Sequence, residues 1–525
     1  DALPILSDFL LGILCLLNSS FSLLLSFVSE QKIKDYVHEH ERNYGYFSVI
    51  PFFFPIESQS YLLLLRQIYE TIILYSMANV IKLRKGLDIN LKGKAAETYA
   101  TVKEPGFYAL VPDDFPGVTP KVVVKEQEYV MAGGPLFIDK YHPEVKFVSP
   151  VSGVVTSVER GARRKVLNIV VEAAAEQDYE DFGKKNVASM DAEAVKSALL
   201  EAGLFAFIKQ RPYDIIADPT VTPKGIFISA FDTNPLAPDF EFALKGEEAN
   251  FQTGLDALAK LAKNYLNISV KQNAAALTQA KNVTITAFDG PNPAGNVGIQ
   301  INHLDPVSKG ETVWTIDPQA VIFIGRLFNT GHVDFTRTVA VTGSEVLKPA
   351  YCKLQVGALL TNVFAGNVTK DKDLRYISGN VLTGKQVSPN GFLGAFHSQL
   401  TVIPEGDDIH EMLGWIMPRF NQFSANRSYF SWLMGKKEYT LDARIKGGER
   451  HMIMSGEYDK VFPMDILPEY LIKAIIAGDI DRMEALGIYE VAPEDFALCE
   501  FVCSSKMELQ RIVRAGLDML RSEMA

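Results

Sequence analysis

The segment from Lys121 to Val155, KVVVKEQEYVMAGGPLFIDKYHPEVKFVSPVSGVV, constrains the fold more than any other part of the chain. Its short apolar and β-branched stretches are separated by turn-forming residues, among them a Gly-Gly pair at 133–134 and the small-residue turn Ser149–Gly153. Short strands bounded in this way favour tight hairpins. Similar patterns continue on both sides, so the sequence predicts a compact all-β unit over residues 77–173.

This segment resembles the flattened β-sandwich of biotinyl and lipoyl carrier domains, the barrel-sandwich hybrid. Asp139-Lys140 stands where carrier domains keep the lysine that bears a swinging arm. However, the nine residues from Tyr141 to Ser149 separate Lys140 from Pro150, and carrier domains are usually shorter here. We therefore expect an unmodified member of this fold, and keep a lipoyl- or biotinyl-type carrier modified at Lys140 as the alternative.

After residue 173 the periodicity changes. Helical patterns at 192–207 and 253–266 alternate with short buried strands at 225–230 and 283–287. Strands that alternate with helices indicate a parallel sheet, so we predict a Rossmann-like α/β domain over residues 174–320.

The rest of the chain predicts two further domains. Strand patterns with Gly and Asn turns return over residues 321–405, which favours a β-grasp, SLBB-like domain. We predict a helical domain over residues 406–525, in which Pro468 suits a first helical turn and Gly478 a helix end. Ser505-Lys-Met-Glu508 has the spacing of a capping box. The fold class is thus a multidomain α+β protein.

The first 76 residues differ from the rest of the chain. Phe9 to Val28 is a run of 20 residues without a charge, long enough to span a bilayer. No basic region precedes it and no small-residue cleavage site comes after it. Since well-patterned sequence starts at Met77, we expect residues 1–76 to be translated upstream sequence or an unstructured apolar leader, with a membrane anchor as the alternative.

Charge and cysteine content exclude some classes of function. The net charge of −11 argues against nucleic acid as a partner, because a basic surface is needed to displace counterions from phosphates. Arg160, Arg163, Arg164 and Lys165 form one basic cluster, which favours an exposed hairpin edge over a phosphate site. Four cysteines in 525 residues are too few for a disulfide framework and fit a reducing, cytoplasmic compartment.

Candidate cofactor sites are weak in this sequence. Cys499 and Cys503 are two thiols on one helical face, fewer than an iron–sulfur cluster needs. The turn Gly290–Gly298 follows a strand but lacks the GxGxxG spacing of a dinucleotide site. Phe205, Phe207 and Tyr213 favour core packing over a quinone or protein groove. The histidines lack zinc-ligand spacing; they are His303, His332, His397, His410 and His451. We therefore assign no catalytic, cofactor-binding or metal residue.

Several motifs in order do carry a family resemblance. These are IKLRKGLD at 81–88, FVSPVSG at 147–153, RGARR at 160–164 and GPNPAG at 290–295. With this domain order, the chain over Met77–Ala525 resembles the A subunit of the Na⁺-translocating NADH:quinone oxidoreductase, the NqrA family. That family is similar to the C subunit of the Rnf complex and to the NADH-binding subunit of respiratory complex I.

The resemblance implies a peripheral subunit on the cytoplasmic face of the bacterial inner membrane. Its partners would be the other five subunits, chiefly the membrane-embedded B subunit, and a direct contact with quinone stays open. The complex passes electrons from NADH through flavins and iron centres to quinone and exports sodium.

Two departures from the wider relatives concern cofactors. Those relatives keep a Gly-Gly-x-Gly-Phe-Pro turn at the flavin and nucleotide site, where this chain has the bulkier Leu200–Lys209. They also carry CxxCxxC-type ligands, of which only Cys499 and Cys503 remain. We expect a cofactor-free scaffold that is not catalytic in isolation, without FMN, NADH or an iron–sulfur centre. A flavin- and NADH-binding input subunit is the further alternative.

Overall fold

The structure, a computed structural model, describes residues 79–407, 416–425 and 427–524. The chain divides into a unit of residues 1–73 and a unit of residues 74–525, and the described residues all belong to the second unit. The apolar run Phe9–Val28, the proposed start at Met77, Cys15 and His410 lie outside the described residues. Within the described ranges, no helix has both the length and the apolar character needed to cross a bilayer.

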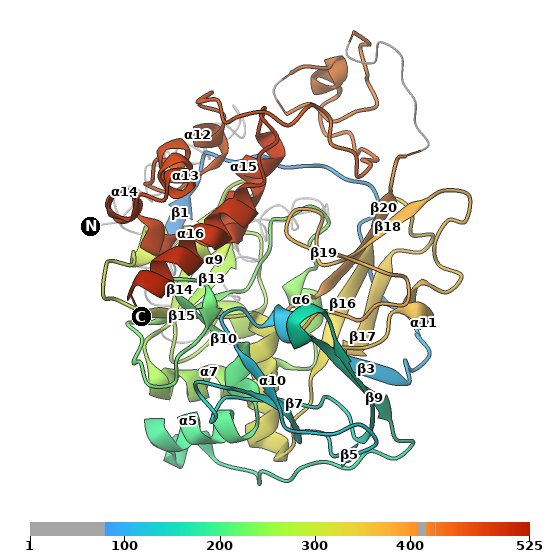
Figure 1. Cartoon of the computed structure of the whole chain (residues 1–525), viewed down its shortest axis with the longest axis vertical. Helices are drawn as coiled ribbons and strands as arrows, with labels where there is room; N and C mark the ends of the chain where they lie inside the picture. The colour runs from blue at the N-terminus through green and yellow to red at the C-terminus, as the bar shows by residue number, and fades with distance from the viewer. Residues whose placement is uncertain (1–78, 408–415, 426, 525) are drawn as a thin grey trace, which may run out of the picture. The chain divides into compact units, whose positions relative to one another are not determined.

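A seven-stranded sheet forms the α/β part of the molecule (Figure 1). Five strands run parallel and the last two are antiparallel to their neighbours. The central strand of this sheet contains the buried run Ile226-Phe-Ile. It is apolar throughout because a central parallel strand is covered on both faces. In spatial order the strands are β1 (Asn79–Lys82), β14 (Thr284–Asp289), β13 (Asn264–Ser269), β12 (Ile226–Ser229), β15 (Val313–Ile316), β10 (Ile208–Arg211) and β11 (Ile215–Ile216).

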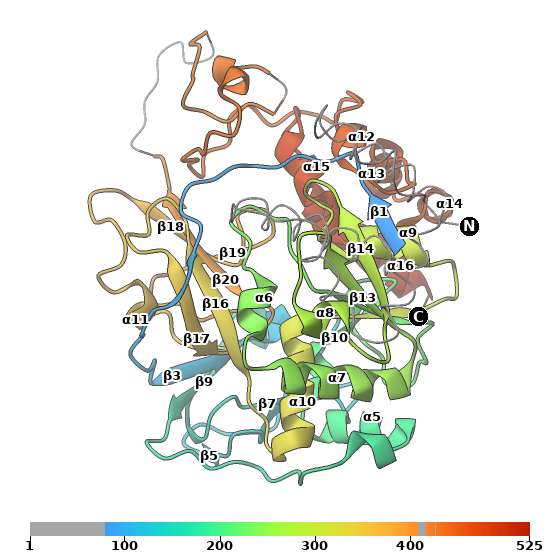
Figure 2. The same ribbon diagram turned by 180° about the vertical axis from the view of Figure 1, so that it is seen from behind.

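Helices connect and cover these strands. The best-defined helix, α10 (Pro318–Thr330), begins with an Asp317 side-chain cap and Pro318 and ends at Gly331 in the left-handed conformation. It lies beside α7 in both views (Figures 1 and 2). The other helices are α5 (Ala192–Glu201), α6 (Phe240–Leu244), α7 (Glu248–Leu261), α8 (Ala275–Thr278) and α9 (Val297–Leu304).

The β-sandwich consists of two small sheets around stacked aromatic rings. The Phe137 and Phe147 rings are parallel with centroids 4.3 Å apart, and Phe115 meets Phe147 edge-on at 4.7 Å. One sheet contains β3 (Phe107–Leu110), β9 (Val166–Ala173), β8 (Gly153–Arg160) and β5 (Tyr129–Val130). The other contains β4 (Pro120–Val122), β6 (Pro135–Asp139) and β7 (Lys146–Val148).

A six-stranded sheet comes after α10. The hairpin β16–β17 is antiparallel, and β20 lies parallel to β16. Because α10 runs to Thr330, the domain boundary predicted between residues 320 and 321 falls inside a helix. The spatial order is β19 (Lys385–Val387), β18 (Leu374–Ser378), β20 (Gln399–Pro404), β16 (Thr336–Thr342), β17 (Ala350–Gln355) and β2 (Ala96–Tyr99), with helix α11 (Thr361–Phe364) after β17.

The first two strands correct one prediction. Both lie in the range predicted as the all-β unit, yet β1 pairs in parallel with β14 and β2 pairs with β17. Residues 79–99 therefore contribute an edge strand to each of two other sheets, and the β-sandwich begins at β3. Hydrophobic alternation shows that a strand forms, but it does not show which sheet the strand joins.

The C-terminal helices pack on the α/β part. Their core includes Leu83 and Ile89 from the segment after β1, and Ile299 of α9. Pro468 starts α13 and Gly478 ends it, as predicted. The predicted capping box is wrong, because the buried Ser505 hydroxyl has no hydrogen-bond partner within the described part of the chain. The helices are α12 (Tyr458–Val461), α13 (Pro468–Ala477), α14 (Ile480–Ala485), α15 (Ala497–Val502) and α16 (Leu509–Met524).

Candidate functional site

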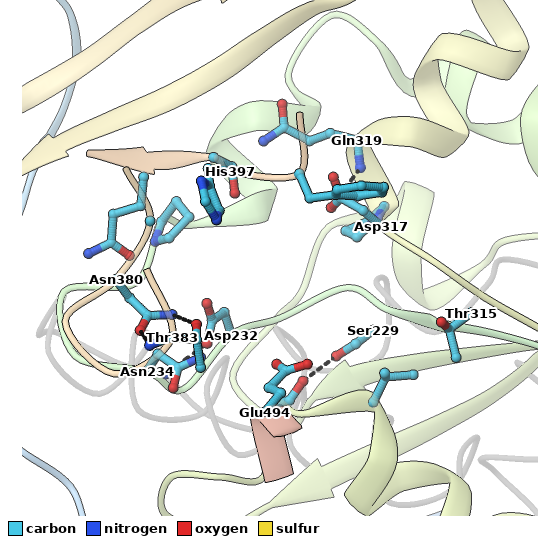
Figure 3. Close-up of a pocket in the computed structure, with 18 of the residues that line it drawn as sticks. Ser229, Asp232, Asn234, Thr315, Asp317, Gln319, Asn380, Thr383, His397 and Glu494 are labelled. Atoms are coloured by element: carbon cyan, nitrogen blue, oxygen red, sulfur yellow. Dashed lines mark hydrogen bonds between the residues drawn. The ribbon is translucent and has the colours of Figure 1, made fainter. Parts of the chain in front are cut away.

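A cavity of about 420 Å³ lies where the α/β sheet, the six-stranded sheet and the C-terminal region meet. Its volume is within the range of small-molecule sites, about 300–1,000 Å³. Figure 3 shows polar side chains from all three parts around one space. The labelled lining residues are Ser229, Asp232, Asn234, Thr315, Asp317, Gln319, Asn380, Thr383, His397 and Glu494.

The α/β sheet contributes the carboxyl ends of two parallel strands. Asp232 follows β12, and its Oδ1 accepts a 2.7 Å hydrogen bond from the Asn234 backbone N–H. Asp317 follows β15 and caps α10, where its Oδ1 accepts from the Gln319 N–H at 3.4 Å. Ligands of open α/β sheets bind at these carboxyl ends. The strand order therefore explains why both carboxylates face one cavity.

The six-stranded sheet contributes His397. Its Nδ1 lies 2.9 Å from the Ser378 hydroxyl, which also accepts a hydrogen bond from the Gly394 N–H at 3.1 Å. Burial lowers the pKa of His397 to about 4, against the opposing charge of Asp114. The imidazole is therefore neutral at pH 7 and serves as a hydrogen-bonding group.

The C-terminal region contributes Glu494, which stands beside a buried ion pair. Burial raises the pKa of Glu494 to about 7, and the neighbouring Asp495 carboxylate adds to this effect. Asp495 Oδ2 lies 2.6 Å from Arg211 Nη1, and both side chains are almost fully buried. The Arg211 guanidinium also donates to the Glu490 carbonyl at 2.9 Å. This pair joins β10 to the C-terminal region at the cavity, which Arg211 lines.

The charge of the lining is predominantly acidic. The described lining residues include two Lys or Arg side chains: Lys209 is half-buried, with its Nζ 4.6 Å from the Phe396 ring centroid, and Arg211 pairs with Asp495. The carboxylates of the lining are Asp214, Asp232, Asp239, Asp317 and Glu494.

The surroundings of the cavity shift the pKa values of two of these carboxylates in opposite directions. Burial alone would raise the pKa of Asp214, but Lys209, Arg211 and Arg514 outweigh it and hold this pKa below its ordinary value. Asp232 opens onto the cavity, yet the surrounding walls remove water from it and raise its pKa. Such an arrangement suits neutral polar or cationic groups and opposes phosphate.

The N-terminus of α10 gives a direct test for phosphate. Free N–H groups at a helix N-terminus form an anion site. Here the Asp317 carboxylate already occupies that end, and Arg337 Nη1 lies 2.7 Å from its Oδ2. A phosphate group would meet this carboxylate and Asp232 nearby. The lining does not fit the phosphate of FMN or NADH.

The stretch Gly203–Lys209 runs from α5 into β10. Gly203 has φ +70°, and a Cβ there would lie 2.6 Å from the Val148 side chain, so this glycine allows close packing on the β-sandwich. Phe205 meets Trp314 edge-on at 5.4 Å in the core, and Phe207 reaches the cavity. Tyr213 lines a separate pocket of about 220 Å³.

The thiols predicted as buried residues lie in the C-terminal core. Cys499 and Cys503 are both buried, and burial raises the pKa of the Cys499 thiol well above its ordinary value. Cys503 Sγ lies 2.9 Å from the Tyr458 hydroxyl. Over residues 79–407, 416–425 and 427–524, no group of three or more His, Cys, Asp or Glu side chains could hold a metal ion.

The other candidates from the sequence are dispersed. Lys140 is exposed at the start of the loop between β6 and β7, and its backbone N–H is bonded to the Thr119 carbonyl at 2.9 Å. His303 and His332 contact backbone carbonyls through Nδ1, at 2.8 and 3.1 Å. His451 lies in a groove near α13.

Of two further candidates, the loop Gly290–Gly298 lies at the cavity and the basic cluster lies at the surface. The loop Gly290–Gly298 backs the cavity, since Gly295 donates its N–H to Thr233 Oγ1 at 3.0 Å. In the basic cluster, Lys165 Nζ pairs with Asp113 at 2.6 Å on an exposed hairpin.

Sequence reasoning missed most of the cavity. Asp232 and Asp317 carried a usable signal, because each is an acidic residue just after a buried strand of an α/β pattern. Glu494 and His397 carried none, since they reach the cavity from two other parts of the chain. Among the histidines that the structure describes, only His397 lines this cavity.

Comparison with protein families gives three matches in chain order. Residues 81–174 match the NqrA N-terminal barrel-sandwich hybrid domain, residues 190–333 match the NqrA second alpha/beta domain, and residues 338–388 match the NQRA C-terminal domain. The resemblance noted from the sequence motifs is confirmed.

Curated relatives match over their whole length. A protein of Saccharophagus degradans is 37% identical over 448 residues, and one of Serratia proteamaculans is 38% identical over 453 residues. A protein of Neisseria meningitidis is 35% identical over 448 residues. Each match covers 85% of this chain and 100% of the relative, and each relative is named as the A subunit of a Na⁺-translocating NADH-quinone reductase.

Among solved structures, an NAD⁺-reducing [NiFe]-hydrogenase in the air-oxidized state is 14% identical, with a TM-score of 0.28. That match covers 42% of this chain and 50% of the hydrogenase chain. A likeness this weak carries no argument about fold or function.

Proposed function

The chain belongs to the NqrA family, the A subunits of the Na⁺-translocating NADH-quinone reductase, and from this we propose that it works as a peripheral subunit of that complex. The match over the full length of the relatives carries this proposal. The complex would pass electrons from NADH to quinone and couple this to sodium export. The chain itself would sit on the cytoplasmic face of the membrane, against the membrane-embedded B subunit near the quinone site, with the other subunits around it.

Within the complex, this chain would act as a scaffold without a cofactor of its own. The acidic cavity supports this, because the Asp317 cap stands where a helix N-terminus would otherwise bind phosphate. The thiols also support it: Cys499 and Cys503 are buried, and Cys499 is held protonated. We propose no catalytic step for the isolated chain.

Purification of the tagged full-length chain from solubilised membranes tests this function. We expect the other subunits of the reductase to be recovered with it and identified by mass spectrometry. Recovery of the chain without them would contradict its role as a subunit. A visible absorption spectrum of the chain alone tests the scaffold role, since tightly bound flavin would contradict it.

The carrier alternative has a separate test at Lys140. The side chain is exposed, so a modifying enzyme could reach it. Intact mass of the purified native protein should match the unmodified chain. An added lipoyl or biotinyl group on Lys140 would overturn the scaffold proposal.

A further inference from the structure

The segment between β20 and α12 exposes an unusual number of large apolar side chains. We call residues 416–425 and 427–454 the docking arm; Figures 1 and 2 both draw it, in orange, projecting beyond β18 and β20. Contiguous exposed apolar surface marks interaction sites in soluble proteins. The exposed side chains are Ile416, Met417, Phe420, Phe430, Trp432, Leu433, Met434, Ile445, Ile453 and Met454.

The docking arm is anchored, so this exposure belongs to a defined conformation. Tyr439 is buried and exchanges backbone hydrogen bonds with the segment after β1: its N–H donates to Asn90 O at 2.8 Å, and its carbonyl accepts from Lys92 N at 3.0 Å. Its hydroxyl donates to the Ser431 carbonyl at 3.1 Å. Phe423 meets Tyr439 edge-on at 5.8 Å. We call the side chains with contacts inside the chain, such as Tyr439 and Phe423, the inward face of the arm, and its exposed large apolar side chains the outward face.

The outward face has the composition of a protein interface. Aromatic residues, Met and Arg are enriched at the centres of such interfaces, and Trp and Arg often dominate the binding energy. The Arg427 guanidinium lies over the Trp432 ring at 5.1 Å, and the Phe420 and Phe430 rings are 5.9 Å apart. At Trp432 and Leu433 the exposed fractions are 47% and 61%.

A groove at the end of the arm adds a charge preference. It has a volume of about 370 Å³ and lies between residues 450–452 and helix α13. The Arg450 N–H donates to the Ser505 carbonyl at 2.9 Å and holds this end in place. No carboxylate is among the described residues that line the groove, which are Arg450, His451, Met452, Lys473, Ile476, Ala477 and Met507.

The charge of the arm contrasts with that of the whole chain. Residues 416–454 hold seven Lys or Arg and three Asp or Glu, in a chain of net charge −11. A basic, apolar surface on an acidic protein is complementary to a partner surface that is apolar with carboxylates at its edge.

We infer that the docking arm and its groove bind an acidic-edged apolar segment of another protein subunit. This inference rests on the proposed function, since it assigns the surface through which the chain joins the complex. The partner segment packs apolar side chains on exposed side chains of the arm such as Trp432 and Leu433, and its carboxylates pair with Arg450 and Lys473 at the groove.

The backbone of the arm favours a protein over a lipid surface. Its regular structure is limited to the 3₁₀ helix Phe430–Met434, and the other described residues of the arm form turns and loops. An irregular backbone placed in lipid leaves N–H and C=O groups without partners. Lipid surfaces are typically bound by long amphipathic helices, whereas a protein partner can satisfy these polar groups itself.

The test compares three substitutions in the full-length tagged chain, expressed in cells that contain the complex. Trp432→Glu and Leu433→Glu place a charge on the outward face. Lys473→Glu reverses a charge at the groove. Leu347→Glu is the matched control, because Leu347 is exposed to 58% in the loop between β16 and β17. Thermal unfolding of each variant checks that the fold is kept.

The inference predicts that Trp432→Glu and Leu433→Glu lower the recovery of the other subunits by about tenfold or more, as loss of an interface anchor does. Lys473→Glu should lower recovery several-fold, more strongly at low salt. Leu347→Glu should match the unchanged chain. If the arm variants also match it, the docking inference is wrong while the proposed function stands. If the unchanged chain recovers no subunit, the proposed function itself fails.

A lipid contact would give a different result. The isolated full-length chain would then bind vesicles containing phosphatidylglycerol, and Trp432→Glu would abolish that binding without changing subunit recovery. That pair of results would overturn the inference of a protein partner. No vesicle binding, together with lost subunit recovery, supports it.

Discussion

The cavity and the docking arm show opposite ways of handling side chains that need a partner. At the cavity, charged groups from three parts of the chain are drawn inward, and Arg211 and Asp495 pair at 2.6 Å away from water. On the arm, apolar groups such as Leu433 point outward with most of their surface exposed. In the cavity the buried charged groups find partners within the chain, whereas on the arm the exposed apolar side chains have most of their surface in contact with solvent.

This difference separates stability from assembly. A buried charge without its partner costs several kcal/mol. Substitutions in the cavity wall should therefore lower the free energy of unfolding of the isolated protein. An exposed apolar side chain contributes little to the free energy of folding. Substitutions on the outward face of the arm should therefore weaken binding of a partner and leave the stability of the isolated chain almost unchanged. Substitutions in the two regions should therefore act on different measurements.

The largest effect is expected at the buried ion pair. Asp495→Asn removes the carboxylate that pairs directly with the buried Arg211 guanidinium, and we expect a loss of about 3–5 kcal/mol in the free energy of unfolding. Urea unfolding of the isolated chain measures it. Glu508→Gln is the control, because Glu508 pairs with Arg511 at the surface and should give little change.

A double substitution sharpens this comparison. Arg211→Met with Asp495→Leu removes both charges and should regain most of the lost stability, since apolar pairs often replace buried ion pairs. If Asp495→Asn is as stable as the unchanged chain, the pair does not hold β10 to the C-terminal region.

The second effect is a pH dependence at Glu494. Its pKa in the folded protein is about 7, above the ordinary value of 4.5, so the folded state holds this proton more tightly than the unfolded state. The stability from this group is complete below pH 4.5 and is lost as the pH rises through 7. Glu494→Gln should therefore raise the stability at pH 8 relative to pH 5 by about 1–3 kcal/mol, compared with the unchanged chain.

The measurement for Glu494 is thermal or urea unfolding at both pH values. Glu193→Gln serves as the control at an exposed position on α5, and its pH profile should run parallel to that of the unchanged chain. A parallel profile for Glu494→Gln as well would show that this carboxyl is not buried in the folded state.

Local rules explain which parts of the fold could be predicted. The limits of α13 could be read from Pro468 and Gly478, because a helix start and a helix end depend on a few neighbouring residues. Ser505 and Glu508 have the right spacing for a cap, but the Glu508 side chain pairs with Arg511 instead. A local motif therefore predicts well only where no neighbouring side chain competes for it.

The cavity could not be predicted for the opposite reason. His397 and Glu494 are almost 100 residues apart, and each lies far along the chain from Asp232. Their neighbours depend on how three parts of the chain pack, as does the pairing of β1 with β14. Patterns within a short stretch of sequence contain no such long-range information. The exposure of the apolar side chains of the arm likewise became visible only with the structure.

The smallest effect is expected on the arm. Leu433→Ser replaces a side chain that is 61% exposed, and surface changes of this kind usually alter the free energy of unfolding by less than about 0.5 kcal/mol. Phe423→Ser is the matched comparison from the inward face, where the ring contacts Tyr439 and Phe501, and it should cost about 2 kcal/mol. Thermal unfolding of the isolated chain measures both. A large loss for Leu433→Ser would mean that the side chain is already covered within the chain, and the contrast between an inward cavity and an outward arm would then fail.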